Sequence, residues 1–169
     1  MMEFDVVDLG PADHPEPGDE VPDFTRPLVT DEFWEDRSLS ELTADGRVVL
    51  VFTPMDGTFL AQYTWDELRD RGWDEYDATV VGVTISTPYV HSRFIDDRDL
   101  PFALFADPTN EVADAYGIAH DLDDMTGVSE PRLAIFVVDE DRVVEDAWVT
   151  TEWPEFLAYD EIEATLESA

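Results

Sequence analysis

RVVLVFTPMDGTFLAQYTWDELRDRG, residues 47–72, is the stretch of sequence that decides the fold. After Arg47, the run VVLVF is continuous, apolar and rich in β-branched side chains, which predicts a buried strand that Pro54 brings to an end. Apolar residues then recur at helical spacing from Phe59 to Arg71, and Gly72 follows as a stop signal. The apolar stripe of this predicted helix consists of Leu60, Ala61, Trp65 and Leu68. A buried strand followed directly by an amphipathic helix indicates an α/β protein.

The same alternation continues toward the C-terminus. TVVGVTI (79–85) predicts a second buried strand, and the residues from Pro88 to about Arg98 predict a helix. The inward side chains of that helix are expected to be Val90, Phe94 and Ile95. The remaining predicted elements are a short strand at 101–107, a short helix at 111–116, a hairpin of strands at 132–139 and 143–149, and a closing helix at 159–167. This order predicts an α/β, thioredoxin-like fold with a mixed central sheet flanked by helices and an insertion around 86–116.

The first residues differ in composition from the rest of the chain. Residues 1–20 are acidic and rich in proline, as in GPADHPEPGDE (10–20). We expect this leader to be extended or partly disordered, because it has little apolar surface to bury. The remaining residues, 21–169, are expected to form a single domain, since a chain of 169 residues suffices for one buried core and shows no internal repeat.

The charge balance is strongly acidic. The chain has 42 Asp and Glu against nine basic residues, all of them arginine, for a formal charge of −33. Repulsion of this size destabilises a small folded domain in dilute buffer, and molar salt with its Debye length of about 3 Å removes most of it. The composition therefore favours the salt-loaded cytoplasm of a halophile. The alternative is an acidic partner of a basic protein or a nucleic-acid mimic, although the carboxylates are spread from Glu3 to Glu167.

The same composition excludes several classes of function. Nucleic acids and anionic membranes need a basic patch, which this sequence lacks. No apolar run approaches the ~20 residues of a membrane span, and the acidic N-terminus has no signal-peptide core, so we expect a cytoplasmic protein. The chain contains no cysteine, which excludes disulfides, thiolate metal sites and thiol catalysis together.

Other site chemistries find little support. The best metal candidate, HDLDD (120–124), lacks the spacing and the glycine of a calcium-binding loop, so we interpret it as a solvated loop and expect no metal. His91, on the helix after Pro88, is expected at the surface or partly packed. Because no nucleotide, dinucleotide or serine-hydrolase motif is present, we expect no cofactor.

Three segments resemble the peroxiredoxin family, that is, the alkyl hydroperoxide reductase and thiol-specific antioxidant group. They are DFTRPLVTDEFW to RVVLVFTP, then VVGVTISTPYVHSRFIDDRDLPFALFADPTNEVADAYGI, and RLAIFVVDEDRVVEDAWV, and the similarity covers roughly residues 20–167. The resemblance implies a short hairpin before the first buried strand, a thioredoxin fold, thiol-dependent reduction of hydroperoxides and a homodimer.

The family's signature is a proline, three residues, a threonine or serine, two residues and the peroxidatic cysteine. Pro54 and Thr58 occupy their positions in this signature, but Ala61 stands where the cysteine belongs. Arg132 matches the family's second arginine-bearing position, and Thr64 replaces the Glu or Gln of many members. An alanine methyl offers neither a nucleophile nor a redox couple.

Each of these residues also has a structural interpretation. Pro54 ends a strand, Thr58 caps a helix, and Arg132 could pair with one of many carboxylates. From the resemblance we expect a peroxiredoxin-like protein that is inactive as a peroxidase and has a binding or structural role. Its vestigial pocket, with Thr58 and Arg132 as donors, would hold a small anion or a partner's side chain, unless Asp56 neutralises Arg132. The alternatives are thiol-independent chemistry in the same cleft, or a structural subunit that pairs with an active paralogue.

Overall fold

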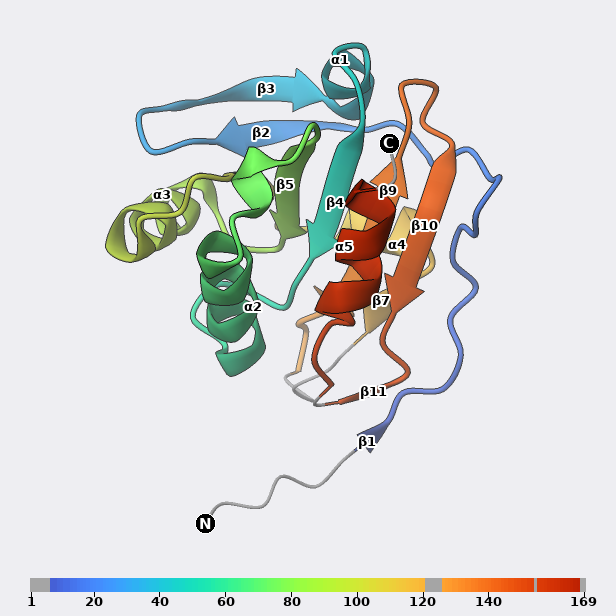
Figure 1. Cartoon of the computed structure of the whole chain (residues 1–169). Helices are drawn as coiled ribbons and strands as arrows, with labels where there is room; N and C mark the ends of the chain where they lie inside the picture. Colours follow the sequence, from blue (N-terminus) through green and yellow to red (C-terminus); the bar gives the residue numbers. More distant parts are fainter. Residues whose placement is uncertain (1–6, 121–125, 154, 168–169) are drawn as a thin grey trace.

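The computed structural model describes residues 7–120, 126–153 and 155–167. Within them, a seven-stranded mixed sheet runs through the molecule in the order β10-β9-β4-β5-β6-β2-β3 (Figure 1). Strands β4, β5 and β6 are parallel, and the other pairings are antiparallel. The strands are β2 Thr25–Val29, β3 Trp34–Ser38, β4 Val48–Phe52, β5 Thr79–Thr84, β6 Ala103–Ala106, β9 Ala134–Val138 and β10 Val144–Val149. The α/β thioredoxin-like fold expected from the sequence is therefore confirmed.

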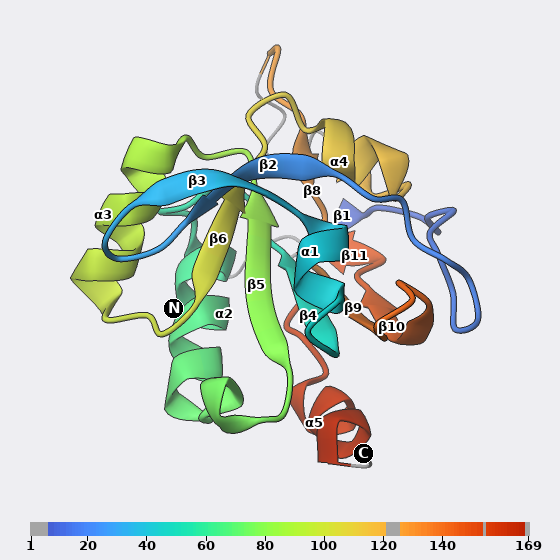
Figure 2. The same cartoon turned by 90° about the horizontal axis from the view of Figure 1, so that it is seen from above.

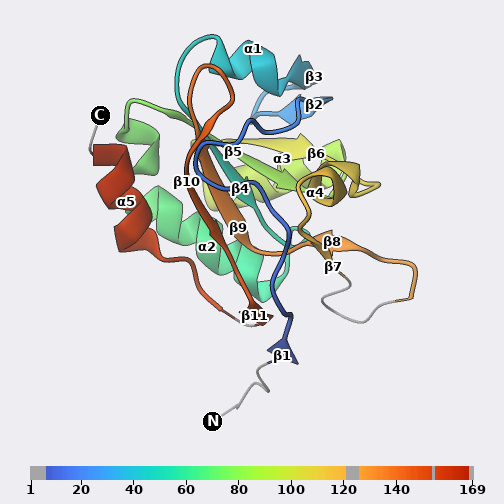
Figure 3. The ribbon, with the colours of Figure 1, turned by 90° about the vertical axis from the view of Figure 1, so that its right-hand side faces the viewer.

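Helices cover both faces of this sheet. The helical elements are α1 Leu39–Thr43, α2 Phe59–Asp70, the short 3-10 helix η1 Trp73–Glu75, α3 Pro88–Arg98, α4 Glu111–Ala115 and α5 Tyr159–Glu167. Side chains of α2, α3 and α5 pack in one apolar cluster, and those of α1 and α4 pack in the other. Figures 2 and 3 show α2 on one side of the sheet and α4 on the opposite side. Both faces of the central strands β9, β4 and β5 are thus buried.

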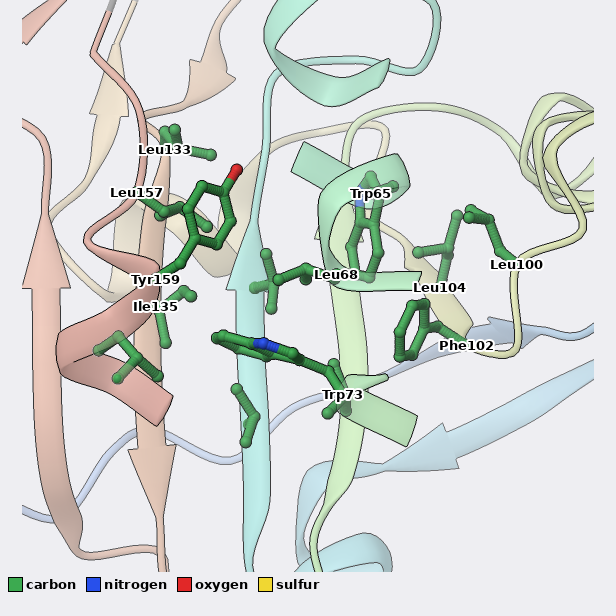
Figure 4. Close-up of a cluster of buried hydrophobic side chains, with 14 of the residues drawn as sticks. Trp65, Leu68, Trp73, Leu100, Phe102, Leu104, Leu133, Ile135, Leu157 and Tyr159 are labelled. Atoms are coloured by element: carbon green, nitrogen blue, oxygen red, sulfur yellow. The ribbon is translucent and has the colours of Figure 1, made fainter. Parts of the chain in front are cut away.

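Strand β4 explains why the continuous apolar run decides the fold. Alternate residues of a strand point to opposite faces, so Val49 and Val51 join the cluster beneath α2, whereas Val48, Leu50 and Phe52 join the other. All five side chains are fully buried. Figure 4 shows the first cluster, in which side chains from α2, η1, the β6 region and the chain leading into α5 converge. A central strand that is buried on both faces is expected to carry apolar side chains at every position.

Tight packing between α2 and the sheet requires one glycine. A Cβ at Gly82, on β5, would lie 2.4 Å from Cζ2 of Trp65 and 2.5 Å from Cδ2 of Leu104. Trp65 is fully buried on α2, so its ring rests directly on the backbone of β5. This contact fixes the distance between α2 and the sheet, and with it the position of the first turn of α2.

The main predicted elements are present, with one error of orientation. The expected helix at 59–71 is α2, and the closing helix at 159–167 is α5. The hairpin that the family resemblance implied is formed by β2 and β3. The inward assignment of Val90 is wrong, because its side chain is 46% exposed, whereas Phe94 and Ile95 are buried as expected.

The described part of the leader, residues 7–20, lies along the domain (Figure 1). The two-residue strand β1 (Val7–Asp8) pairs with β11 (Glu152–Trp153), and Glu20 forms an isolated bridge with Val143. The amide of Gly18 donates to the carbonyl of Val144 at 2.9 Å. The described part of the leader therefore contacts the domain at both of its ends.

Two further structural points concern the classes of function considered above. None of the described helices is long and apolar enough to cross a membrane. A short pairing of β7 (Ala119–His120) with β8 (Glu130–Pro131) frames the segment that holds most of the HDLDD cluster. Residues 121–124 of that cluster lie outside the described residues, so the interpretation as a solvated loop stays a prediction.

Candidate functional site

The loop that joins β4 to α2 is held at each of its residues. The carbonyl of Pro54 accepts a hydrogen bond from the Thr84 hydroxyl at 3.3 Å. The next two amides donate to side chains, that of Met55 to Oε2 of Glu130 at 2.8 Å and that of Asp56 to Oγ of Ser86 at 2.9 Å. Because partners come from two separate segments of the chain, the end of β5 with the residues after it and the segment at Glu130, the loop has one well-defined path into the helix.

Thr58 begins α2 as its N-cap. Its backbone is extended, and its Oγ1 accepts a hydrogen bond from the amide of Ala61 at 3.3 Å. The same hydroxyl donates to the carbonyl of Met55 at 2.9 Å. Ala61 lies in the first turn of the helix with no exposed surface. Both hydrogen-bonding roles of the Thr58 hydroxyl are therefore used within the loop and the helix.

Arg132 makes its contacts with the leader and the end of β10. Its Nη1 donates to the carbonyls of Gly10 at 2.7 Å and Thr150 at 3.4 Å, and its Nη2 donates to the carbonyl of Leu9 at 3.0 Å. The residue is 6% exposed, and burial lowers the pKa of its guanidinium below the ordinary value. Its Nε has no partner among the described residues. The structure thus brings Pro54, Thr58 and Ala61 together at one corner and turns most of the Arg132 donors toward carbonyl oxygens.

Asp56 makes a different ion pair from the one that the sequence left open. The alternative of an Asp56–Arg132 pair is wrong, because Oδ2 of Asp56 lies 2.6 Å from Nδ1 of His91. The two side chains are 1% and 0% exposed. The expected location of His91 at or near the surface is therefore also wrong. The imidazole is fully buried because a carboxylate and a carbonyl group satisfy its two nitrogens.

The hydrogen bonds of His91 define where its protons lie. Nε2 is 3.0 Å from the carbonyl oxygen of Phe105, which can only accept, so Nε2 carries a proton. The short contact between Nδ1 and Oδ2 of Asp56 then shares one further proton. Either the pair is imidazolium with carboxylate, or neutral imidazole with carboxylic acid. In both states the second oxygen of Asp56, Oδ1, is a hydrogen-bond acceptor.

Sequence reasoning missed two buried groups beside this loop. His91 carried a signal, because residues 91, 94 and 95 lie on one helical stripe, but hydropathy favoured Val90 for the inward position. Glu130 is 1% exposed and places its carboxylate against the Met55 amide, 75 residues away in sequence. No local pattern around Glu130 indicates that contact.

The site offers no nucleophile at the first turn of α2. Ala61, where the resemblance places the peroxidatic cysteine, contributes only a buried methyl group, and the Thr58 hydroxyl is engaged in the cap. Thr64, at the position where many family members have Glu or Gln, is fully buried in the following turn. Among the described residues, no group of three His, Asp or Glu side chains could hold a metal ion.

A mixed sheet of this order, with a proline-containing loop that leads into a threonine-capped helix, defines a thioredoxin-fold protein of the redoxin class. The model of the AhpC/TSA family matches residues 17–147, and the chain belongs to that family. The expected family membership is therefore confirmed.

The relatives and neighbours are peroxiredoxins. A chloroplastic 2-Cys peroxiredoxin, BAS1 of Spinacia oleracea, is 25% identical over 147 residues, which are 81% of this chain and 53% of that protein. A peroxiredoxin of Mycobacterium tuberculosis is 30% identical over 131 residues, 76% of this chain and 82% of the relative. The chain spans about half the length of the first curated relatives it matches, 53% in both cases.

Among solved structures, the peroxidoxin BcpB of Mycobacterium tuberculosis superposes with a TM-score of 0.76 at 29% identity, covering 92% of this chain and 98% of that one. AhpC of Enterococcus faecalis has the same TM-score, 0.76, at 16% identity, and covers 91% of this chain and 92% of its own. The second likeness shows the fold alone.

Proposed function

We propose that this chain is a peroxiredoxin-family protein without cysteine peroxidase activity, retained for a binding or structural role. One observation carries the proposal: Ala61 occupies the position of the peroxidatic cysteine, in a chain of 169 residues that contains no cysteine. Peroxide reduction in this family's manner needs a thiolate that attacks the peroxide oxygen. The chain therefore keeps the fold of the family but lacks the cysteine thiolate that peroxide reduction needs.

The surroundings of Ala61 support this proposal. In an active site the threonine hydroxyl would be available to the thiolate and to the peroxide. Here the Thr58 hydroxyl accepts from the Ala61 amide and donates to the Met55 carbonyl. The Arg132 guanidinium likewise donates to the Leu9 and Gly10 carbonyls. The Thr58 hydroxyl and the Arg132 guanidinium thus make hydrogen bonds within the protein itself.

Binding at the vestigial pocket of Pro54, Thr58, Ala61 and Arg132 is part of the same proposal. A small anion or a partner's acidic side chain would compete with the two leader carbonyls for the Arg132 guanidinium, because those carbonyls accept hydrogen bonds from both of its terminal nitrogens. The buried and unpartnered Nε of Arg132 supports such an exchange, since an unsatisfied donor costs roughly 1–3 kcal/mol. Binding here should therefore release the leader.

The physiological setting follows from the charge. We infer a halophilic, cytoplasmic protein that needs neither metal nor cofactor and contacts neither nucleic acid nor membrane. Arg71 illustrates how the few cations are used, with Glu67, Asp160 and Glu163 all within ion-pair distance of its guanidinium. A homodimer is inferred from the family resemblance.

Two alternatives remain in different classes. The first is an enzyme that uses the same cleft without a thiol, and Glu130, a buried carboxylate at the loop, is the residue that favours it. The second is a structural subunit that pairs with an active paralogue.

A peroxide-consumption assay in molar KCl, with thioredoxin or another thiol donor, tests the main proposal. We expect consumption no faster than with heat-treated protein. Turnover that survives metal chelation would contradict the proposal and favour the enzyme. Affinity capture from an extract at the same salt, followed by identification of the bound chains, separates a paralogue partner from a small ligand.

A further inference from the structure

The leader is held to the domain mainly by backbone hydrogen bonds. Near its N-terminal end, the amide of Leu9 donates to the carbonyl of Thr151 at 2.8 Å. Near its other end, Val144 of β10 makes two backbone hydrogen bonds with the leader, at 2.8 and 2.9 Å. None of residues 8–20 is fully buried. A segment that buries so little apolar surface opens at a lower free energy than the core does.

The fixed part of the chain begins at Val21. Its side chain is 1% exposed, and its amide donates to the carbonyl of Arg142 at 2.9 Å. The carbonyl of the next residue, Pro22, accepts a hydrogen bond from the Tyr116 hydroxyl at 2.8 Å. The leader can therefore open as far as Val21 while the domain stays folded.

Arg132 holds the N-terminal part of the leader through neutral acceptors. Its guanidinium donates to the carbonyls of Leu9 and Gly10, and among the described residues no carboxylate pairs with it. Hydrogen bonds from a guanidinium to a carboxylate are roughly twice as strong as those between neutral groups. The leader is thus attached by contacts that other groups can replace.

Strand β10 is an edge of the sheet, and the leader runs beside it (Figures 1 and 3). Both carboxylates of β10 already have partners within the chain. Oε2 of Glu145 lies 2.9 Å from Nη2 of Arg47, and Oδ2 of Asp146 accepts from the Thr165 hydroxyl at 2.7 Å. Free charges on an edge strand discourage pairing with a further strand, and here they are engaged. The leader is therefore the main cover of this edge.

A second copy of the chain is the partner that the uncovered edge fits. The same strand from two copies can pair antiparallel about a twofold axis, which gives a closed contact. Ala147, Trp148 and Val149 of β10 are only half-buried in one copy, so pairing would bury more of their apolar surface. Molar salt screens the repulsion between two chains of charge −33.

We propose that the leader is a latch on β10. When closed, it keeps β10 from pairing with the β10 of a second copy, and the homodimer forms from copies whose leaders are open. This inference rests on the homodimer of the proposed function and adds the surface that forms it and the segment that controls it. Because each dimer needs two open leaders, a change in leader opening acts on the dimer twice.

A disulfide tests the latch directly, because the chain has no cysteine of its own. Asp8 and Glu152 are exposed and directly opposite each other in the β1–β11 pair, a spacing that suits a disulfide. Sedimentation equilibrium of the full-length Asp8→Cys/Glu152→Cys variant in molar KCl should show dimerisation at least tenfold weaker when oxidised than after reduction. Equal dimerisation in the two states would overturn the latch.

A matched pair of leader variants makes the opposite change. Leu9→Pro removes the amide that donates to Thr151, whereas Leu9→Ala shortens the side chain and keeps that amide. Loss of one hydrogen bond shifts leader opening by about fivefold, so Leu9→Pro should dimerise about 25-fold more tightly than Leu9→Ala. Both changes lie outside the packed core, so both variants should melt with the wild-type protein. Equal dimerisation of the two variants would overturn the latch and leave the homodimer standing, whereas the absence of a dimer in every variant would overturn both.

Discussion

Replacing His91 with leucine is the sharpest test of the Asp56–His91 pair. Leucine keeps an apolar body on α3 but removes both hydrogen-bonding nitrogens. The Asp56 side chain, 1% exposed, would then lose the partner of Oδ2 while Oδ1 already lacks one, and the Phe105 carbonyl would lose its donor. Removal of one member of a buried pair costs about 3–5 kcal/mol. For a domain of this size, that loss lowers the melting temperature by about 6–20 °C.

Asp56→Asn is the matched control. The asparagine amide can donate to Nδ1 of a neutral imidazole, while Nε2 still donates to the Phe105 carbonyl. The asparagine keeps both hydrogen bonds of His91 and removes only the charge, so we expect a change in the free energy of unfolding within about 1 kcal/mol. The comparison therefore separates the loss of a partner from the loss of a charge.

Urea unfolding in molar KCl, followed by tryptophan fluorescence, measures both variants. Urea is uncharged and leaves the ionic strength constant, which guanidinium chloride would not. Equal losses in the two variants, or a loss below about 1 kcal/mol in His91→Leu, would refute the argument that leaving Asp56 without its buried partner is what destabilises the protein.

Four further outcomes follow from the fold and the charge. Ala61→Cys should give a thiol with a pKa below about 8.5, because the N-terminus of α2 favours the thiolate; a titration at or above that value would mean that burial outweighs the helix terminus. The melting temperature should rise steeply from dilute buffer to molar KCl, and full stability in about 10 mM salt would reject the halophilic interpretation. Sedimentation at high salt should show a dimer, and a species near the 19.2 kDa chain mass would exclude it. Arg132→Gln should speed protease cleavage within the leader, since the Leu9 and Gly10 carbonyls lose their donors, and an unchanged rate would show that other contacts hold it.

The backbone was predictable where local chemistry and tertiary packing agree. Strand β4 follows from a continuous apolar run, and α2 follows from an apolar stripe between a threonine cap and Gly72. The α1 helix was not predicted, although Ser38 and Glu41 form a capping box at its start. It has five residues, too few for an apolar period to emerge.

Only those parts of the site that lie close together in the sequence were predictable. Pro54, Thr58 and Ala61 stand in one short motif, and the structure keeps them together. The pairs Asp56–His91 and Met55–Glu130 and the contact of Arg132 with Gly10 span 35, 75 and 122 residues. Such contacts depend on how the elements pack, so a single sequence does not indicate them.

The path of the leader has a consequence for how copies of the chain meet. Strand β10 is one edge of the sheet, and the Gly18 amide and the Glu20 bridge occupy the backbone groups at its start. The other edge, β3, carries Glu35, Asp36 and Arg37, side chains that discourage a foreign strand. In molar salt, repulsion between copies is screened, and net charge no longer keeps exposed edges apart. Protection against aggregation through pairing of edge strands then depends on the leader at β10 and on the charged side chains of β3. A chain shortened at its N-terminus should therefore aggregate more readily in molar salt.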